Sequence, residues 1–176
     1  MSDKPEQTVQ RYFAGLAENT FNSELGVVDP PLVDYLTDLL VRFIRSDVVH
    51  RIRSVTGRPL MSVSEMLSEA PERIGEARRE LYRHVGDFTL FWAGVYPEAL
   101  RHGSAAQDQF TDYCTHGKRS YHIASQLDVQ DLARLDEALL LERLSEQFEL
   151  CCYGLREVRR HWEEGDGGPG NVILIG

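Results

Sequence analysis

Apolar side chains recur at intervals of three and four residues along almost the whole chain, and this period most constrains the fold. The clearest case follows Asp29, a good N-cap residue, and two prolines that suit the first turn of a helix. The apolar positions after it form one wide face: Leu32, Val33, Leu36, Leu39, Leu40, Phe43 and Ile44. A period near 3.6 residues predicts an amphipathic helix over residues 29–44.

The same spacing predicts further helices elsewhere in the chain. Long helices are expected over residues 7–25, 71–95, 104–124 and 128–162. Ser62 and Glu65 form the S-x-x-E pattern of a capping box, which predicts a short helix over residues 62–70. Pro97 should end or kink the helix before it. The period is lost over residues 50–60, where a Thr-Gly turn signal is compatible with a tiny hairpin.

The predicted fold is all-α: a single-domain bundle of about five long amphipathic helices plus one short helix. The bundle should span residues 1–164. Residues 165–176 contain a Gly-rich segment followed by Asn-Val-Ile-Leu-Ile-Gly, and they are expected to form a flexible linker and a short apolar tail. Such a tail is of the kind that docks in a groove of its own bundle or of a partner.

Charge and cysteine content restrict the function. The formal net charge of -9 disfavours nucleic acid and anionic membranes as partners, because phosphate binding depends on Lys and Arg. The three cysteines, without Cys-x-x-Cys spacing, are typical of a reducing compartment. The N-terminus lacks an apolar signal core, and no apolar run approaches the ~20 residues that span a bilayer. A cytoplasmic protein is therefore expected.

A metal site is one hypothesis for the aromatic-rich stretch over residues 83–103. His84 and Asp87 lie three apart, and Glu98 and His102 lie four apart, so each pair shares a helix face. Histidine and carboxylate at this spacing bind Fe, Mn or Zn in helical bundles. The alternative assigns Asp87 to a surface ion pair with Arg83 and the other pair to helix ends.

A second hypothesis concerns arginine and histidine separated by four residues, over 45–50, 79–84 and 156–161. This pattern resembles the R-x4-6-H motif of HEPN-type ribonucleases, which are α-helical and similar in size. The resemblance implies a histidine base and an arginine that stabilises the phosphorane charge. Arg79 and His84 are the catalytic candidates on this reading.

Most other polar residues have a packing explanation. Cys114 lies on an apolar stripe and behaves as a small buried hydrophobe, and Gly117 in the same stripe would allow another helix to approach closely. Lys118, Arg119 and His122 form a local basic spot that is best explained as a solvated face. With no catalytic signature in the chain, the preferred function is an interaction or regulatory protein that binds a protein partner or forms homo-oligomers.

Overall fold

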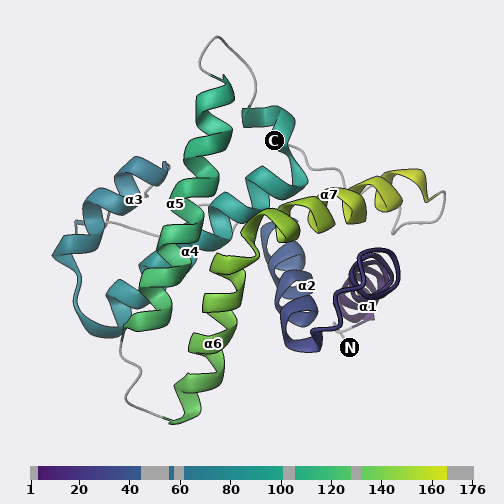
Figure 1. Ribbon diagram of the computed structural model, residues 1–176, viewed down its shortest axis with the longest axis horizontal. Helices are drawn as coiled ribbons and strands as arrows, with labels where there is room; N and C mark the ends of the chain where they lie inside the picture. The colour runs from purple at the N-terminus through teal and green to yellow at the C-terminus, as the bar shows by residue number, and fades with distance from the viewer. Residues whose placement is uncertain (1–3, 45–55, 58–61, 101–105, 128–131, 166–176) are drawn as a thin grey trace.

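The computed structural model describes residues 4–44, 56–57, 62–100, 106–127 and 132–165, and every regular element among them is helical (Figure 1). Seven α-helices lie in these ranges: α1 (Lys4–Glu18), α2 (Pro30–Ile44), α3 (Val63–Glu69), α4 (Gly75–Val95), α5 (Ala106–Gln126), α6 (Leu132–Glu146) and α7 (Phe148–Glu164). Three short helical segments join them: a π-helix η1 (Asn19–Glu24) and the 3-10 helices η2 (Ala70–Glu72) and η3 (Pro97–Leu100). The all-α prediction is confirmed.

Local sequence signals set several helix ends as expected. Oδ1 of Asp29 accepts a hydrogen bond from the backbone N–H of Leu32 at 3.3 Å, which caps the start of α2. The Ser62–Glu65 capping box forms in both directions at the start of α3. Helix α4 ends at Val95, just before Pro97.

The predicted helix count needs one correction. The apolar stripe over residues 128–162 was expected to form one long helix, but Gln147 interrupts it with φ −106° and ψ 24°. Two helices, α6 and α7, therefore replace one, and six of the seven α-helices are long. The stripe continues across the break because Leu144, Phe148 and Cys151 are all buried on their respective helices.

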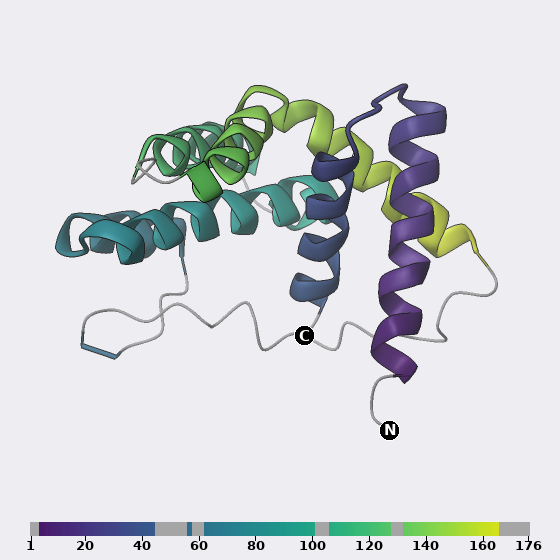
Figure 2. The ribbon, with the colours of Figure 1, turned by 90° about the horizontal axis from the view of Figure 1, so that it is seen from below.

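Helix α4 occupies the centre of the fold. It packs against α5, α7, α2 and α3. Every residue from 84 to 91 is buried, so this part of α4 is enclosed on all sides and not only along one stripe. Figure 2 shows α1 and α2 side by side, with α7 passing across them. The aromatic residues of the stretch over residues 83–103 therefore lie mostly in the core.

Glycines allow three close helix contacts. A Cβ atom on Gly117 of α5 would overlap Thr89 of α4 and the ring of Phe148 on α7, which confirms the expected close approach. A Cβ on Gly154 of α7 would likewise overlap the ring of Phe21 in η1. The absent side chains thus let α5 and η1 lie directly against their neighbours.

Two predictions fall mainly outside the described residues. Only Thr56 and Gly57 belong to the described part of the stretch where a hairpin was expected. The linker and tail over residues 165–176 are described only at Gly165. Both stay predictions. Among the described helices, none is both long and apolar enough to cross a membrane.

Candidate functional site

The carboxylate of Asp87 on α4 is 1% exposed and has several polar partners. Its Oδ1 accepts hydrogen bonds from two tyrosine hydroxyls, Tyr35 of α2 at 2.6 Å and Tyr121 of α5 at 2.7 Å. Its Oδ2 pairs with the guanidinium of Arg42 at 3.1 Å. A buried carboxylate needs such partners, because an unpaired charge in the core is strongly unfavourable.

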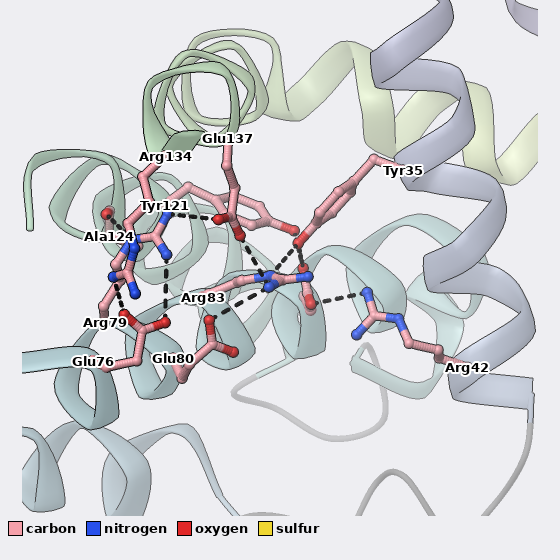
Figure 3. Close-up of polar contacts among 11 residues, drawn as sticks. Tyr35, Arg42, Glu76, Arg79, Glu80, Arg83, Tyr121, Ala124, Arg134 and Glu137 are labelled. Carbon is pink, nitrogen blue, oxygen red and sulfur yellow. Dashed lines mark hydrogen bonds and ion pairs between the residues drawn. The ribbon is translucent and has the colours of Figure 1, made fainter. Parts of the chain in front are cut away.

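Arginine side chains extend this network to α6 (Figure 3). Nε of Arg83 donates to the Tyr35 hydroxyl at 3.2 Å, and its Nη1 pairs with Glu137 at 3.1 Å. The second oxygen of Glu137 lies 3.0 Å from Nη2 of Arg79, which is buried. Nε of Arg79 also donates to the carbonyl oxygen of Ala124 at 3.3 Å. One continuous polar network therefore joins α2, α4, α5 and α6.

The network also fixes the protonation of its tyrosines. Burial, and then the negative charge of Asp87, raise the pKa of both Tyr35 and Tyr121 above the ordinary value of 10.0. Both phenols are therefore neutral donors at physiological pH. Because both phenols donate to the carboxylate of Asp87, their hydrogen bonds link α2 and α5 to α4.

Three of the four predicted metal ligands lie among the described residues, and each has contacts of its own. Asp87 has partners on both oxygens, so a cation would have to displace Arg42 or a tyrosine. His84 lies between the rings of Phe43 and Phe88, with centroids 6.0 and 6.4 Å away. Glu98 pairs with Arg159 of α7.

The remaining predicted ligand, His102, lies outside the described residues, so the four-residue site stays a prediction. The alternative surface pair of Arg83 with Asp87 needs correction. Asp87 is buried and pairs with Arg42, whereas Arg83 pairs with Glu80 and Glu137.

The Arg79–His84 pair, the catalytic candidate of the ribonuclease reading, is buried within α4. Arg79 is 1% exposed and His84 is 9% exposed. The contacts of Arg79 with Ala124, Glu137 and Glu76 commit its guanidinium to the network. Neither side chain of the pair is exposed at the surface of the described structure.

A different histidine–carboxylate group does converge. Glu157 and His161 lie four apart on α7, and Glu24 approaches them from η1, so that one ligand atom from each lies within 4.8 Å of the others. Within the described residues, no other set of three or more His, Cys, Asp or Glu side chains comes so close. The Glu157–His161 spacing matches that of Glu98 and His102, so the sequence held a signal for this pair. Nothing local in the sequence pointed to Glu24.

The three cysteines are free and buried, which confirms the prediction made for Cys114. The Cys152 thiol on α7 hydrogen-bonds to Cys114 on α5, which lowers the pKa of Cys114 and raises that of Cys152. Burial raises the pKa of Cys151 to about 12. A thiol with so high a pKa is a poor nucleophile, so Cys151 serves packing.

The basic spot on α5 is paired with α6 and α7. Lys118 contacts Glu149 at 2.8 Å, and His122 contacts Glu142 at 2.9 Å. Glu142 also accepts a hydrogen bond from the Ser125 hydroxyl at 2.6 Å. These contacts agree with the expected solvated face.

No family model matches the chain, and neither the curated proteins nor the solved structures contain a match to it.

Proposed function

We propose that the protein is a helical interaction module that self-associates through the outer face of α6. The observation that carries this proposal is the exposure of three leucines on one helix. Leu132, Leu135 and Leu139 are 85%, 42% and 51% exposed. They lie three and four residues apart, which is the spacing of a helix–helix seam.

The opposite face of α6 is anchored in the fold. Leu141 and Leu144 are buried, and α6 packs against α5. Glu137 is held by Arg79 and Arg83 of α4. On the leucine side, four residues after Leu139, Arg143 pairs with Asp29 at 2.8 Å. A helix fixed in this way presents its outer leucines without the entropy cost of ordering a mobile segment on binding.

The leucine face is self-complementary, which favours a second copy of this chain as the partner. In an antiparallel pair of α6 helices with a two-fold axis near Leu135, the Leu132 side chain of one copy would face Leu139 of the other. Six leucines would then share one small apolar contact. A two-fold interface of this kind is the commonest form of self-association.

The size of the face sets the expected affinity. Full burial of one leucine contributes about 1.5–3 kcal/mol, and these leucines are already partly covered. Association costs at least about 4 kcal/mol in translational and rotational freedom. The expected complex is therefore weak and depends on protein concentration.

Sedimentation velocity over a wide concentration range tests the proposal. Wild-type protein should show a sedimentation coefficient that rises with concentration, and Leu135→Glu combined with Leu139→Glu should abolish the rise. Leu150→Glu is the matched control, because Leu150 is 37% exposed on α7 and should leave association unchanged. A wild type that stays monomeric throughout, or a double variant that associates like wild type, contradicts self-association through α6.

A further inference from the structure

The group formed by Glu24, Glu157 and His161 is separate from both the Asp87 network and the leucine face. We infer that these three side chains form a binding site for a first-row divalent transition metal of the zinc type. The inference rests on how the three side chains are brought together, on the state of the His161 ring nitrogen and on the chemistry of the donor set.

The convergence follows from backbone features of two elements. Glu157 and His161 are one helical turn apart on α7 and so point from the same face. Gly154, one turn before Glu157, lets the ring of Phe21 lie directly on the α7 backbone. This contact brings η1 against α7 and places Glu24 beside His161. The π-helical turn, which closes with a Leu25 N–H to Thr20 carbonyl bond at 3.0 Å, is a feature that often marks functional sites.

The contact between His161 and Glu24 brings a ring nitrogen of α7 against a carboxylate oxygen of η1. Nε2 of His161 lies 2.7 Å from Oε1 of Glu24, yet this nitrogen is shielded from solvent and has no well-directed hydrogen bond within the described residues. In the comparable pair on α5, Nδ1 of His122 has hydrogen-bond geometry to Glu142 at 2.9 and 3.0 Å. The ring nitrogen and the carboxylate oxygen thus lie next to each other, with Glu157 as the third member of the group.

Neighbouring side chains orient the two carboxylates. Nδ2 of Asn19 donates to Oε1 of Glu24 at 3.0 Å. Arg160 contacts Oε2 of Glu157 at 2.8 Å and also pairs with Glu164, which balances part of its charge. Both contacts of Arg160 with Glu157 go to Oε2, which leaves Oε1 without a contact to Arg160. Outer contacts that fix ligand orientation are typical of metal sites.

The donor set selects the class of metal. One neutral imidazole and two carboxylates carry a charge of -2, which a divalent cation neutralises. Zinc bonds to nitrogen and carboxylate oxygen are about 2.0–2.2 Å long, which places tetrahedral ligand atoms roughly 3.4 Å apart. Ligand atoms that lie within 4.8 Å of one another reach this spacing with shifts of up to roughly 0.8 Å each. An imidazole ligand favours zinc over magnesium and calcium, which prefer all-oxygen sites. Three protein ligands leave a fourth position for water.

Isothermal titration of Zn²⁺ into untagged, chelator-treated full-length protein tests the site. Wild type should bind one Zn²⁺ per chain at this site and should not bind Mg²⁺ there. His161→Ala and Glu24→Gln should each weaken Zn²⁺ binding by at least about 100-fold, the upper range for loss of even an outer contact. His122→Ala is the matched control, since it removes a histidine that is paired with one carboxylate and has no second carboxylate beside it, and this variant should bind Zn²⁺ like wild type.

A folding control and two further results test the zinc site. Far-UV circular dichroism of the metal-free variants checks folding, and both substitutions lie at partly exposed side chains. No Zn²⁺ binding by wild type would overturn the inference. Wild-type affinity in either His161→Ala or Glu24→Gln would also overturn it, because all three ligands are required. Self-association through α6 is measured separately, so either proposal fails without the other.

Discussion

Tyr35 and Tyr121 donate their hydroxyl hydrogens to the same oxygen atom, Oδ1 of Asp87, although they lie on helices α2 and α5. This one oxygen atom of α4 thus links α2 to α5. Two short charge-assisted hydrogen bonds at one atom are a strong arrangement, because each is shorter and stronger than a neutral one. The shared acceptor makes Asp87 the point on which the packing of these helices depends.

Asp87→Asn should therefore be strongly destabilising. The amide has one acceptor oxygen and no charge, so Arg42 loses its counter-ion and an amide N–H₂ faces donors. Removal of one partner from a buried ion pair costs about 3–5 kcal/mol, and partial exposure of Arg42 places the expected loss near the lower end. Urea unfolding followed by circular dichroism measures it.

Tyr35→Phe and Tyr121→Phe are the controls for this substitution. Each removes one donor and leaves the charge pair in place, so each should cost about 1–1.5 kcal/mol. If Asp87→Asn were no more destabilising than either phenylalanine variant, the carboxylate would not be the centre of the network.

The raised tyrosine pKa values predict a loss of stability at alkaline pH. Below pH 10.0 both phenols are protonated in the folded and unfolded chains, so the stabilisation is complete. Above it the unfolded chain releases these protons while the folded chain keeps them, and each phenol lowers the free energy of unfolding by about 1.4 kcal/mol per pH unit. Urea unfolding between pH 9 and pH 11 checks the slope.

A double variant separates the tyrosines from other buried groups. Cys151 has a raised pKa as well and contributes with the same sign. Tyr35→Phe combined with Tyr121→Phe should therefore reduce the alkaline slope but not remove it. An unchanged slope in the double variant would mean that these phenols ionise in the folded protein as they do in the unfolded chain.

Much of the fold was predictable because its signals are local. The N-cap at Asp29, the Ser62–Glu65 capping box and the stop before Pro97 all depend on contacts within a few residues. The break at Gln147 was not predictable. No Gly or Pro marks it, and the apolar stripe continues through it. Directly after the break, Phe148 packs against Gly117 of α5.

The polar network was less accessible to sequence reasoning. Asp87 was identified as notable, but its partners Tyr35 and Tyr121 are 52 and 34 residues away, and no spacing rule connects them. Arg83 lies four residues before Asp87, which suggested a surface pair. Burial of the whole α4 segment changed the partners, and burial on all sides is a tertiary property that one helix's period does not reveal.

Glu137→Gln should destabilise the fold more than loss of a surface ion pair. Glu137 supports both Arg83 and the buried Arg79, so its neutral isostere leaves a buried guanidinium without its nearest counter-ion. Because Glu137 is itself one-third exposed, the expected loss in the free energy of unfolding is about 1–3 kcal/mol.

Glu149→Gln is the control: its pair with Lys118 is solvent-exposed and should contribute about 0–1 kcal/mol. Chemical unfolding of both variants measures the difference, and equal costs would contradict a supporting role for Glu137.

Gly117→Ala should destabilise the protein because the space at this position is already filled. The added methyl group would overlap the hydroxyl of Thr89 and the fully buried ring of Phe148. Overpacking of this kind typically costs about 1–3 kcal/mol.

Gly15→Ala is the matched control, since Gly15 lies in α1 with no heavy atom within 4 Å of the added Cβ. There, higher helix propensity should stabilise by about 0.5–1 kcal/mol. Thermal and urea unfolding should therefore shift in opposite directions for the two variants. A shift in the same direction would mean that helix propensity outweighs the close α5–α7 contact.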